Sequence, residues 1–276
     1  KKDKKYIAID RAINEFRSGR PIIINKGNNS WIFFTLEHAN VKLLEDISKK
    51  SSAKIFACIS NDKANYLSKS NLSYKEASIM YFDLNKIKLL KSIHTKELKL
   101  LNKNKIQKKY FSKIPKFFND IVDLAKNAKM IPCLIGSNIK KENMNHSIMV
   151  FNHKDLLKQN ELIAESTKII SKSNIPLAKA HKSYIRVFKS FIGGLEHIAL
   201  QIGNPSKKKP INLRIQSACL TGEVFHSIKC DCNEQLHQSI EYIAKNGGGY
   251  IIHLEQEGRG IGLANKIKAY EMQYKG

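Results

Sequence analysis

Three cysteines in the C-terminal third of the chain have the type and spacing of a metal site. Cys219, Cys230 and Cys232 follow the pattern C-x10-C-x-C. Three thiolates fill three corners of a tetrahedral zinc site, and a structural site would close with a fourth Cys or His. His226 and His237 are the nearby residues that could close it, but the pattern favours an open corner. A water held there has its pKa lowered toward neutrality, which makes it a hydrolytic nucleophile.

A glycine-rich run begins 25 residues after Cys232 and reads Glu-Gly-Arg-Gly-Ile-Gly from Glu257 to Gly262. Glycines let the backbone approach a ligand closely, and free N–H groups at the start of a helix bind phosphate. Arg259 adds a positive charge to this run. Such a run is also typical of a flexible connection, but beside the cysteines it favours phosphate binding. The two motifs together predict a zinc hydrolase that acts on a nucleotide.

The composition indicates a folded and strongly basic protein. The 276 residues are 42% hydrophobic and carry a formal net charge of +24. Only six of the 48 basic residues are Arg, and the lysines are spread along the whole chain. We therefore interpret the charge as a solvated surface that attracts an anionic substrate, and nucleic-acid binding as disfavoured.

The sequence also indicates a cellular compartment. No apolar run approaches the length of a membrane span, and the lysine-rich start lacks the apolar stretch of a signal peptide. Five cysteines without an export signal argue against a disulfide framework. Cys58 and Cys133 lie in apolar runs and are predicted to be buried in strands. We expect a cytoplasmic protein with no membrane partner.

The hydrophobic periodicity predicts an α/β (α+β layered) fold with two domains. Serine, asparagine and proline interrupt the pattern around Ser171–Lys182, which places the domains at 1–180 and 181–276. Residues 81–115 give no clear pattern. In the first domain we predict helices at 9–16, 41–50, 116–127 and 153–172, and strands at 21–25, 31–35, 54–60, 130–136 and 147–151. In the second we predict strands at 197–202, 211–216 and 250–254, and helices at 236–243 and 263–270.

The order of elements in the second domain brings the two motifs together. The cysteines lie between a strand and a helix, and the glycine-rich run lies between the next strand and helix. Loops that leave strands and open helices are where α/β proteins place their ligands. We therefore expect Gln235 and Arg259, each near the start of a helix, to face one ligand.

Three stretches of this region closely resemble GTP cyclohydrolase II of riboflavin biosynthesis, over roughly residues 183–276. They are Ser217–Phe225, Cys230–Leu236 and Gln256–Tyr270. The resemblance implies zinc ligation by Cys219, Cys230 and Cys232, and Mg²⁺ with the triphosphate. It also implies GTP contacts from Arg214, Ile215, Gln216, Ser217, Ala218, Gln235, Glu257, Gly258 and Arg259. The implied reaction is opening of the GTP imidazole ring by a zinc-activated water at C8, with release of formate and pyrophosphate.

The chain departs from this family in several places. Where the family reads Arg-Val-His-Ser-Glu before the first cysteine, this chain has Gln216 in place of the His and Ala218 in place of the Glu. Asn233 replaces a glycine after the third cysteine. The family's catalytic acid and Arg lie further along than Gly276, so we expect a fragment with no catalytic residue of its own and no activity by itself.

The N-terminal part is similar, more faintly, to 3,4-dihydroxy-2-butanone 4-phosphate synthase at Phe16–Pro21 and the strand after it. That family places an acidic, Mg²⁺-binding loop next, whereas Lys26–Trp31 contains no carboxylate. Phe117, Phe118 and Asn119 replace a later His-Thr-Glu. Without carboxylates there is no site for a hard cation, so we expect a degenerate synthase-like domain used for folding, dimer contacts or regulation.

The leading hypothesis is thus a zinc-dependent GTP cyclohydrolase II joined to a non-catalytic domain, with GTP as ligand and a homodimeric assembly. A bifunctional synthase and cyclohydrolase is one alternative, disfavoured by the missing acidic loop. A non-catalytic zinc protein that binds RNA or a protein partner is the other. Release of formate from GTP in a zinc-dependent way separates the hypotheses.

Overall fold

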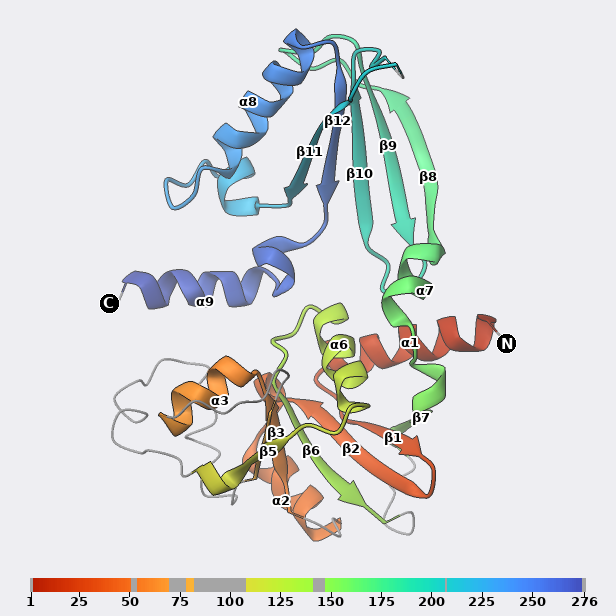
Figure 1. Cartoon of the computed structure of the whole chain (residues 1–276), viewed down its shortest axis with the longest axis vertical. Coiled ribbons are helices and arrows are strands. Elements are labelled where there is room, and N and C mark those ends of the chain that lie inside the picture. Colours follow the sequence, from red (N-terminus) through yellow and green to blue (C-terminus); the bar gives the residue numbers. More distant parts are fainter. Residues whose placement is uncertain are drawn as a thin grey trace. The chain divides into compact units, whose positions relative to one another are not determined.

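The computed structural model describes residues 2–50, 54–69, 78–81, 108–140, 147–206 and 208–274. The chain forms two compact units, one of residues 1–159 with 268–276 and one of residues 160–267. Each unit combines helices with one sheet (Figure 1). The predicted α/β class with two domains is therefore confirmed. The predicted domain bounds, 1–180 and 181–276, remain a prediction.

The first unit contains, within its described residues, a seven-stranded sheet in the order β5-β4-β3-β6-β2-β1-β7. Neighbouring strands are antiparallel, apart from the parallel pair of β1 and β7. The strands are β1 (Ile22–Lys26), β2 (Asn29–Thr35), β3 (Phe56–Ile59), β4 (Ser78–Tyr81), β5 (Phe111–Lys113), β6 (Leu134–Ile139) and β7 (Met149–Asn152). The helices are α1 (Lys2–Arg17), α2 (Val41–Lys50), α3 (Asn61–Ser68) and α6 (Phe118–Asn127).

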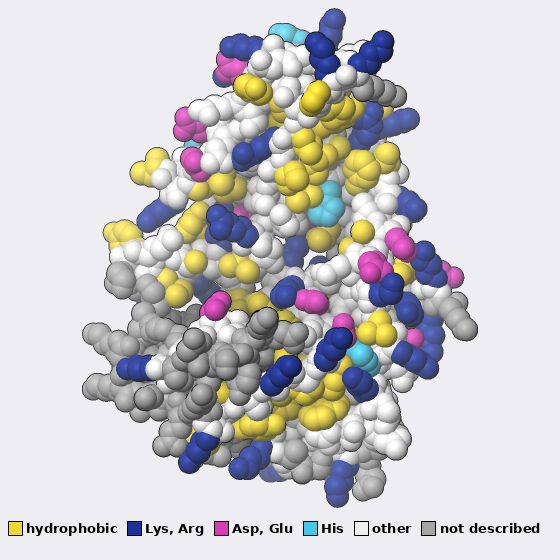
Figure 2. Space-filling view, in the orientation of Figure 1, with side chains coloured by type: hydrophobic (Ala, Val, Ile, Leu, Met, Phe, Trp, Pro, Cys, Tyr) yellow, Lys and Arg dark blue, Asp and Glu magenta, His cyan; other side chains and the backbone are white. Residues whose placement is uncertain are grey.

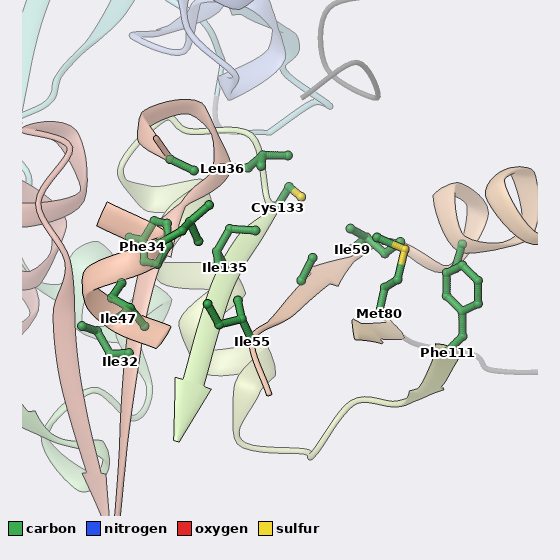
Figure 3. Packing of buried hydrophobic residues seen from close by; sticks show 14 of the residues in the cluster. Ile32, Phe34, Leu36, Ile47, Ile55, Ile59, Met80, Phe111, Cys133 and Ile135 are labelled. Carbon is green, nitrogen blue, oxygen red and sulfur yellow. The ribbon is translucent and has the colours of Figure 1, made fainter. Parts of the chain in front are cut away.

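Alternation along the strands gives this sheet two apolar faces, each covered by helices. On one face Ile32 and Phe34 of β2 and Ile135 of β6 pack against Ile47 of α2 (Figure 3). Cys133 lies in the same cluster and is 2% exposed. Cys58 is fully buried, and this burial raises the pKa of its thiol. Both cysteines are buried as predicted.

Aromatic side chains cluster around the start of α6. Phe118, at the start of α6, is fully buried and lies 5.2 Å from the ring of Trp31 and 5.0 Å from the ring of Phe33. Lys26 and Asn29 pair across a two-residue turn, so the expected loop is a tight β-hairpin. Gly27 has a φ of +60°, which such turns require and glycine adopts without strain.

The second unit contains, in the part of it that the structure describes, a five-stranded sheet in the order β11-β12-β10-β9-β8. β11 and β12 are parallel, and the other neighbours are antiparallel. The strands are β8 (Thr167–Asn174), β9 (Ser183–Ser190), β10 (Glu196–Ile202), β11 (Asn212–Ser217) and β12 (Gly249–Leu254). The helices of this part of the chain are α7 (Gln159–Ser166), α8 (Cys232–Lys245) and α9 (Leu263–Tyr274).

The predicted long helix at 153–172 is wrong. The segment contains a short 3-10 turn, the helix α7 and then the start of β8. Thr167, Ile169 and Ile170 have branched side chains that favour a strand, and Thr167 and Ile169 pair with Ser190 and Phe188 of β9. The predicted helix continues past Ser166, the residue at which α7 ends.

The parallel pair β11 and β12 is connected by α8, as the predicted order of elements requires. The helix packs its apolar side on the sheet through Leu236, Ile240 and Ile243, against Ile202 and Ile251. This packing fixes the start of α8 near the carboxyl ends of β11 and β12, and both chemical motifs lie at that edge.

No helix among the described residues is both long and apolar enough to cross a membrane. Lys and Arg side chains are scattered over the visible face of the molecule among polar and apolar ones, rather than gathered in one patch (Figure 2).

Candidate metal centre

The three cysteines meet although they come from two places. Cys219 lies two residues after the end of β11, Cys232 is the first residue of α8, and Cys230 lies two residues before it. Their sulfur atoms all lie within 4.8 Å of one another, and the sulfurs of Cys219 and Cys230 are 3.5 Å apart. Zinc–sulfur bonds of 2.3 Å in a tetrahedron place sulfurs about 3.8 Å apart. The three side chains therefore fit one zinc-sized ion.

Gly222 makes room for this cluster. It lies in the turn Leu220–Val224, and a Cβ atom added to it would lie 2.9 Å from the sulfur of Cys230 and 3.2 Å from that of Cys219. The conformation of Gly222 is not left-handed, so its role is to leave space. The chain thus folds closely around the sulfurs and forms a cradle, and a larger side chain at position 222 would enter the space that the sulfurs occupy.

Charges around the cysteines favour a thiolate at Cys219. Burial by itself raises the pKa of Cys219, but the hydrogen bond from the Lys266 ammonium, 3.0 Å away, lowers it to about 7. Burial and the two neighbouring sulfurs raise the pKa of Cys232 to about 12. Sulfurs that repel one another as anions can all be thiolates only with a cation between them, so the donor set suits a metal ion.

Glu257 connects the glycine-rich run to the cysteine loop. Its Oε2 accepts a hydrogen bond from the backbone N–H of Leu220 at 2.7 Å. Its Oε1 accepts one from the Lys266 ammonium at 2.7 Å and a weaker one from the N–H of Gly258 at 3.3 Å. Burial raises the pKa of this carboxyl, but the bonds from Lys266 and the backbone outweigh burial and lower it. Glu257 is therefore an anion held by the protein itself.

A buried amide organises the other side of the site. Gln216 is 3% exposed, and its Oε1 accepts hydrogen bonds from Nε and Nη2 of Arg214 at 3.2 and 3.0 Å. Its Nε2 donates to Oε1 of Glu223 at 3.1 Å and to the carbonyl oxygen of Cys232 at 3.4 Å. Arg214 also donates to Gln235 at 2.6 Å. Both the oxygen and the nitrogen of the Gln216 amide are thus hydrogen-bonded within the protein.

The histidines near the cysteines have different surroundings. His226 and His237 are exposed, and among the described residues neither is a member of the metal-sized cluster. Nε2 of His253, on β12, lies 2.9 Å from Oε2 of Glu223. His253 is thus half-buried and paired with Glu223.

The residues expected to contact GTP lie at one edge of the sheet. Arg214 and Gln235 line an open cavity of about 470 Å³ between β11 and α8. Arg259 is exposed and has a φ of +57°, a strained conformation for a side chain other than glycine. Ile215 is 62% exposed, whereas Gln216 is buried within the hydrogen-bonded network. Ser217, Ala218 and Gly258 lie in the adjoining segments, where Gln256 donates to Ser217 and the N–H of Ala218 to the carbonyl of Leu254.

Sequence reasoning assigned no role to Lys266 or Glu223. Both lie within the stretches that resemble the family, Ser217–Phe225 and Gln256–Tyr270. Only their contacts in the folded chain distinguish them from the other charged residues there. The spacing of 47 residues between Cys219 and Lys266 has no local periodicity that could have indicated the contact.

The fold and the site define a class: an α/β domain with a three-cysteine metal cradle and a glycine-rich, Arg-bearing loop at one sheet edge. The family model of GTP cyclohydrolase II matches residues 167–276. The C-terminal segment of the chain is therefore similar to this family over those residues.

Curated relatives have matching names. GTP cyclohydrolase-2 of Azospirillum brasilense is 33% identical over 162 residues, which are 56% of this chain and 42% of the relative. The riboflavin biosynthesis protein RibBA of Phocaeicola vulgatus is 41% identical over 120 residues, 44% of this chain and 28% of the relative. GTP cyclohydrolase-2 of Shewanella oneidensis is 53% identical over 83 residues, 30% of this chain and 41% of the relative. The chain thus spans less than half the length of these relatives.

Among solved structures, a two-domain 3,4-dihydroxy-2-butanone 4-phosphate synthase from A. baumannii aligns with 96% of this chain and 87% of its own, at a TM-score of 0.40 and 9% identity. A 3,4-dihydroxy-2-butanone 4-phosphate synthase in complex with two magnesium ions aligns with 56% of this chain and 96% of its own, at a TM-score of 0.38 and 11% identity.

Proposed function

We propose that this chain belongs to a zinc-dependent GTP cyclohydrolase II, which opens the imidazole ring of GTP and releases formate and pyrophosphate as the first step of riboflavin biosynthesis. The observation that carries the proposal is the convergence of three cysteine sulfurs within 4.8 Å, inside the segment that matches the family. The proposed ligands are Cys219, Cys230 and Cys232. A zinc ion supplies Lewis acidity at an open position and lowers the pKa of water there.

The chain's own residues bind and orient the nucleotide. Arg214 and Gln235 line the cavity beside β11 with a guanidinium and an amide. Gln216 accepts hydrogen bonds from Arg214, and Asp231 accepts one from Gln235. The guanidinium offers charge and directed N–H donors to an anionic or carbonyl group. The contacts expected from Ile215, Ser217 and Ala218 belong to the same edge.

The glycine-rich loop is proposed to receive the triphosphate. Arg259 projects a cation from a loop whose glycines at 258, 260 and 262 all have positive φ angles. These glycines let the backbone turn tightly around Arg259, and its guanidinium supplies the charge and N–H donors that suit phosphate oxygens. Departure of pyrophosphate leaves negative charge that Arg259 and Mg²⁺ would stabilise.

The proposal is tested by metal and nucleotide binding of the 276-residue chain and by turnover of the intact gene product. The chain should bind about one zinc ion and then GTP in preference to ATP, and the Cys230→Ser variant should lose zinc. The intact protein should release formate from GTP, and a chelator should abolish the release. Zinc binding without GTP binding or formate release would favour a non-catalytic zinc protein.

We further propose that the N-terminal domain, placed at residues 1–180 from the sequence, is a degenerate synthase-like domain. Support comes from the hairpin at Gly27, which lacks carboxylates, and from the aromatic cluster around Phe118. A cytoplasmic homodimer is the proposed state of the protein. Formation of dihydroxybutanone phosphate from ribulose 5-phosphate would show a bifunctional enzyme instead.

A further inference from the structure

Lys266 of α9 is placed between the metal cradle and the glycine-rich loop. Its ammonium group lies 3.0 Å from the sulfur of Cys219 and 2.7 Å from Oε1 of Glu257. The side chains of Lys266 and Glu257 are 12% and 15% exposed, so water competes little for these contacts. Ionic hydrogen bonds in such surroundings are shorter and stronger than neutral ones.

We propose that Lys266 is a positioning residue of the metal centre, which holds the Cys219 thiolate from outside the coordination shell and ties it to Glu257. The inference rests on the metal site proposed above and adds to it a residue that the cysteine motif does not contain. Groups that hydrogen-bond to metal ligands orient them and tune their donor strength.

The charge balance of the site favours a positively charged group beside the thiolates. Three thiolates carry three negative charges, and a divalent zinc ion leaves one of them uncompensated. Cys230 and Cys232 lie at the start of α8, where the helix dipole favours negative charge. Cys219 lies outside that helix and is 4% exposed, and the Lys266 ammonium lies 3.0 Å from its sulfur.

Glu257 extends this contact into the loop. One of its oxygens accepts from Lys266, and the other accepts from the N–H of Leu220, the residue after the first metal ligand. The Glu257 carboxylate thereby joins the loop that carries Arg259 to the cysteine loop in two ways. One oxygen bonds Leu220 directly, and the other is connected to the sulfur of Cys219 through Lys266. Metal binding, which orders Cys219, and the conformation of the glycine-rich loop are therefore coupled through Lys266.

The test compares Lys266→Met with Lys268→Met in the complete 276-residue chain. Lys268 lies on the same helix and is exposed, so it controls for loss of one positive charge. Zinc affinity is measured by competition with a chromophoric chelator, and Co²⁺ is used as a spectroscopic probe of the thiolates. We expect Lys266→Met to weaken zinc binding roughly 10–100-fold, as for other changes in groups that support metal ligands, and Lys268→Met to leave it unchanged.

The Co²⁺ spectrum provides a readout that a merely structural role would not move. A thiolate that loses an ionic hydrogen bond donates charge more readily, so the sulfur-to-cobalt band of Lys266→Met should shift to longer wavelength. Lys266→Arg keeps the positive charge with a different geometry, so its cobalt band should lie between those of the unaltered chain and Lys266→Met. Glu257→Gln should weaken zinc binding in the same direction.

A folded Lys266→Met variant with the zinc affinity and cobalt band of the unaltered chain overturns the inference. If Lys266→Met does not fold by circular dichroism, unchanged zinc affinity in both Lys266→Arg and Glu257→Gln overturns it equally. If the unaltered chain binds neither ion, the metal site itself is rejected along with this inference. Binding by the unaltered chain with no effect of the variants rejects only the role of Lys266.

Discussion

Single side chains at the metal cradle are constrained by space as much as by chemistry. Gly222 faces the sulfurs of Cys230 and Cys219 at distances where a methyl group forces the neighbours to shift. The thiol and carboxylate partners around it are in turn fixed by hydrogen bonds from Lys266 and Leu220. The geometry of the three sulfurs therefore depends on residues that are not ligands.

Gly222→Ala should weaken zinc binding because the added Cβ pushes the Cys230 sulfur away from its neighbours. Overpacking of this kind costs about 1–3 kcal/mol. Competition with a chromophoric chelator measures the change in affinity, and Ala244→Gly, at an exposed position of α8, serves as a control outside the cradle. Equal affinity for zinc before and after the Gly222 substitution would show that the turn adapts freely.

Gln216→Leu should lower the free energy of unfolding by about 1–3 kcal/mol, because buried partners of the amide lose a hydrogen bond. Urea denaturation followed by circular dichroism measures this loss. Gln238→Leu removes an amide from an exposed position on α8 and should change stability by less than about 0.5 kcal/mol. Similar effects from the two substitutions would argue against the network around Gln216.

At the scale of elements, the first unit depends on helix α6 being anchored by one aromatic ring. Phe118 is fully buried and contacts the rings of Trp31, Phe33 and Phe56. These contacts hold the helix on the face of the sheet opposite α2. The same aromatic cluster takes the place of the polar groups that a hard cation would need.

Phe118→Ala should destabilise the first unit by about 3–5 kcal/mol, through lost burial and the cavity that remains. Urea unfolding followed by the fluorescence of Trp31, the single tryptophan, reports on this unit. Phe225→Ala, at a side chain that is 70% exposed, is the matched control. Zinc affinity should be unchanged by Phe118→Ala, because each unit has its own core.

The elements also show where sequence patterns are sufficient. The predicted order of strand, helix and strand around the cysteines is confirmed by β11, α8 and β12, because α8 has a regular apolar stripe. The segment after α7 was wrongly predicted as helix, since β8 is mostly exposed and has no buried periodicity. Its strand conformation follows from pairing with β9, a partner that local sequence cannot reveal.

At the scale of the whole molecule, the two units have separate hydrophobic clusters and the metal cradle belongs to one of them. A ligand that binds only the folded state stabilises the unit that holds it. Among the described residues, the hydrophobic cluster under α8 in the second unit has four buried residues and four partly buried ones, fewer than the cluster beside α2 in the first unit. Metal should therefore contribute more to its stability than to that of the first unit.

Removal of zinc by a chelator should lower the melting temperature of the second unit and leave that of the first unchanged. A ligand at 100 times its dissociation constant stabilises by about 2.7 kcal/mol. Calorimetry with hydrogen exchange of residues 160–267 measures the effect, and a variant with all three motif cysteines replaced by serine should no longer respond. A uniform loss of protection in both units would contradict independent folding.

The sequence by itself determined which chemistry to expect of this protein, because metal ligation and phosphate binding require particular residue types at short spacings. The C-x10-C-x-C motif predicts metal binding, and the Glu257–Gly262 run predicts phosphate binding. Only the tertiary structure decided how the motifs are joined. Lys266 meets Cys219 from 47 residues away, and His253 meets Glu223 from 30 residues away. Such contacts depend on how α9 and β12 pack at the sheet edge, and no local pattern encodes that packing.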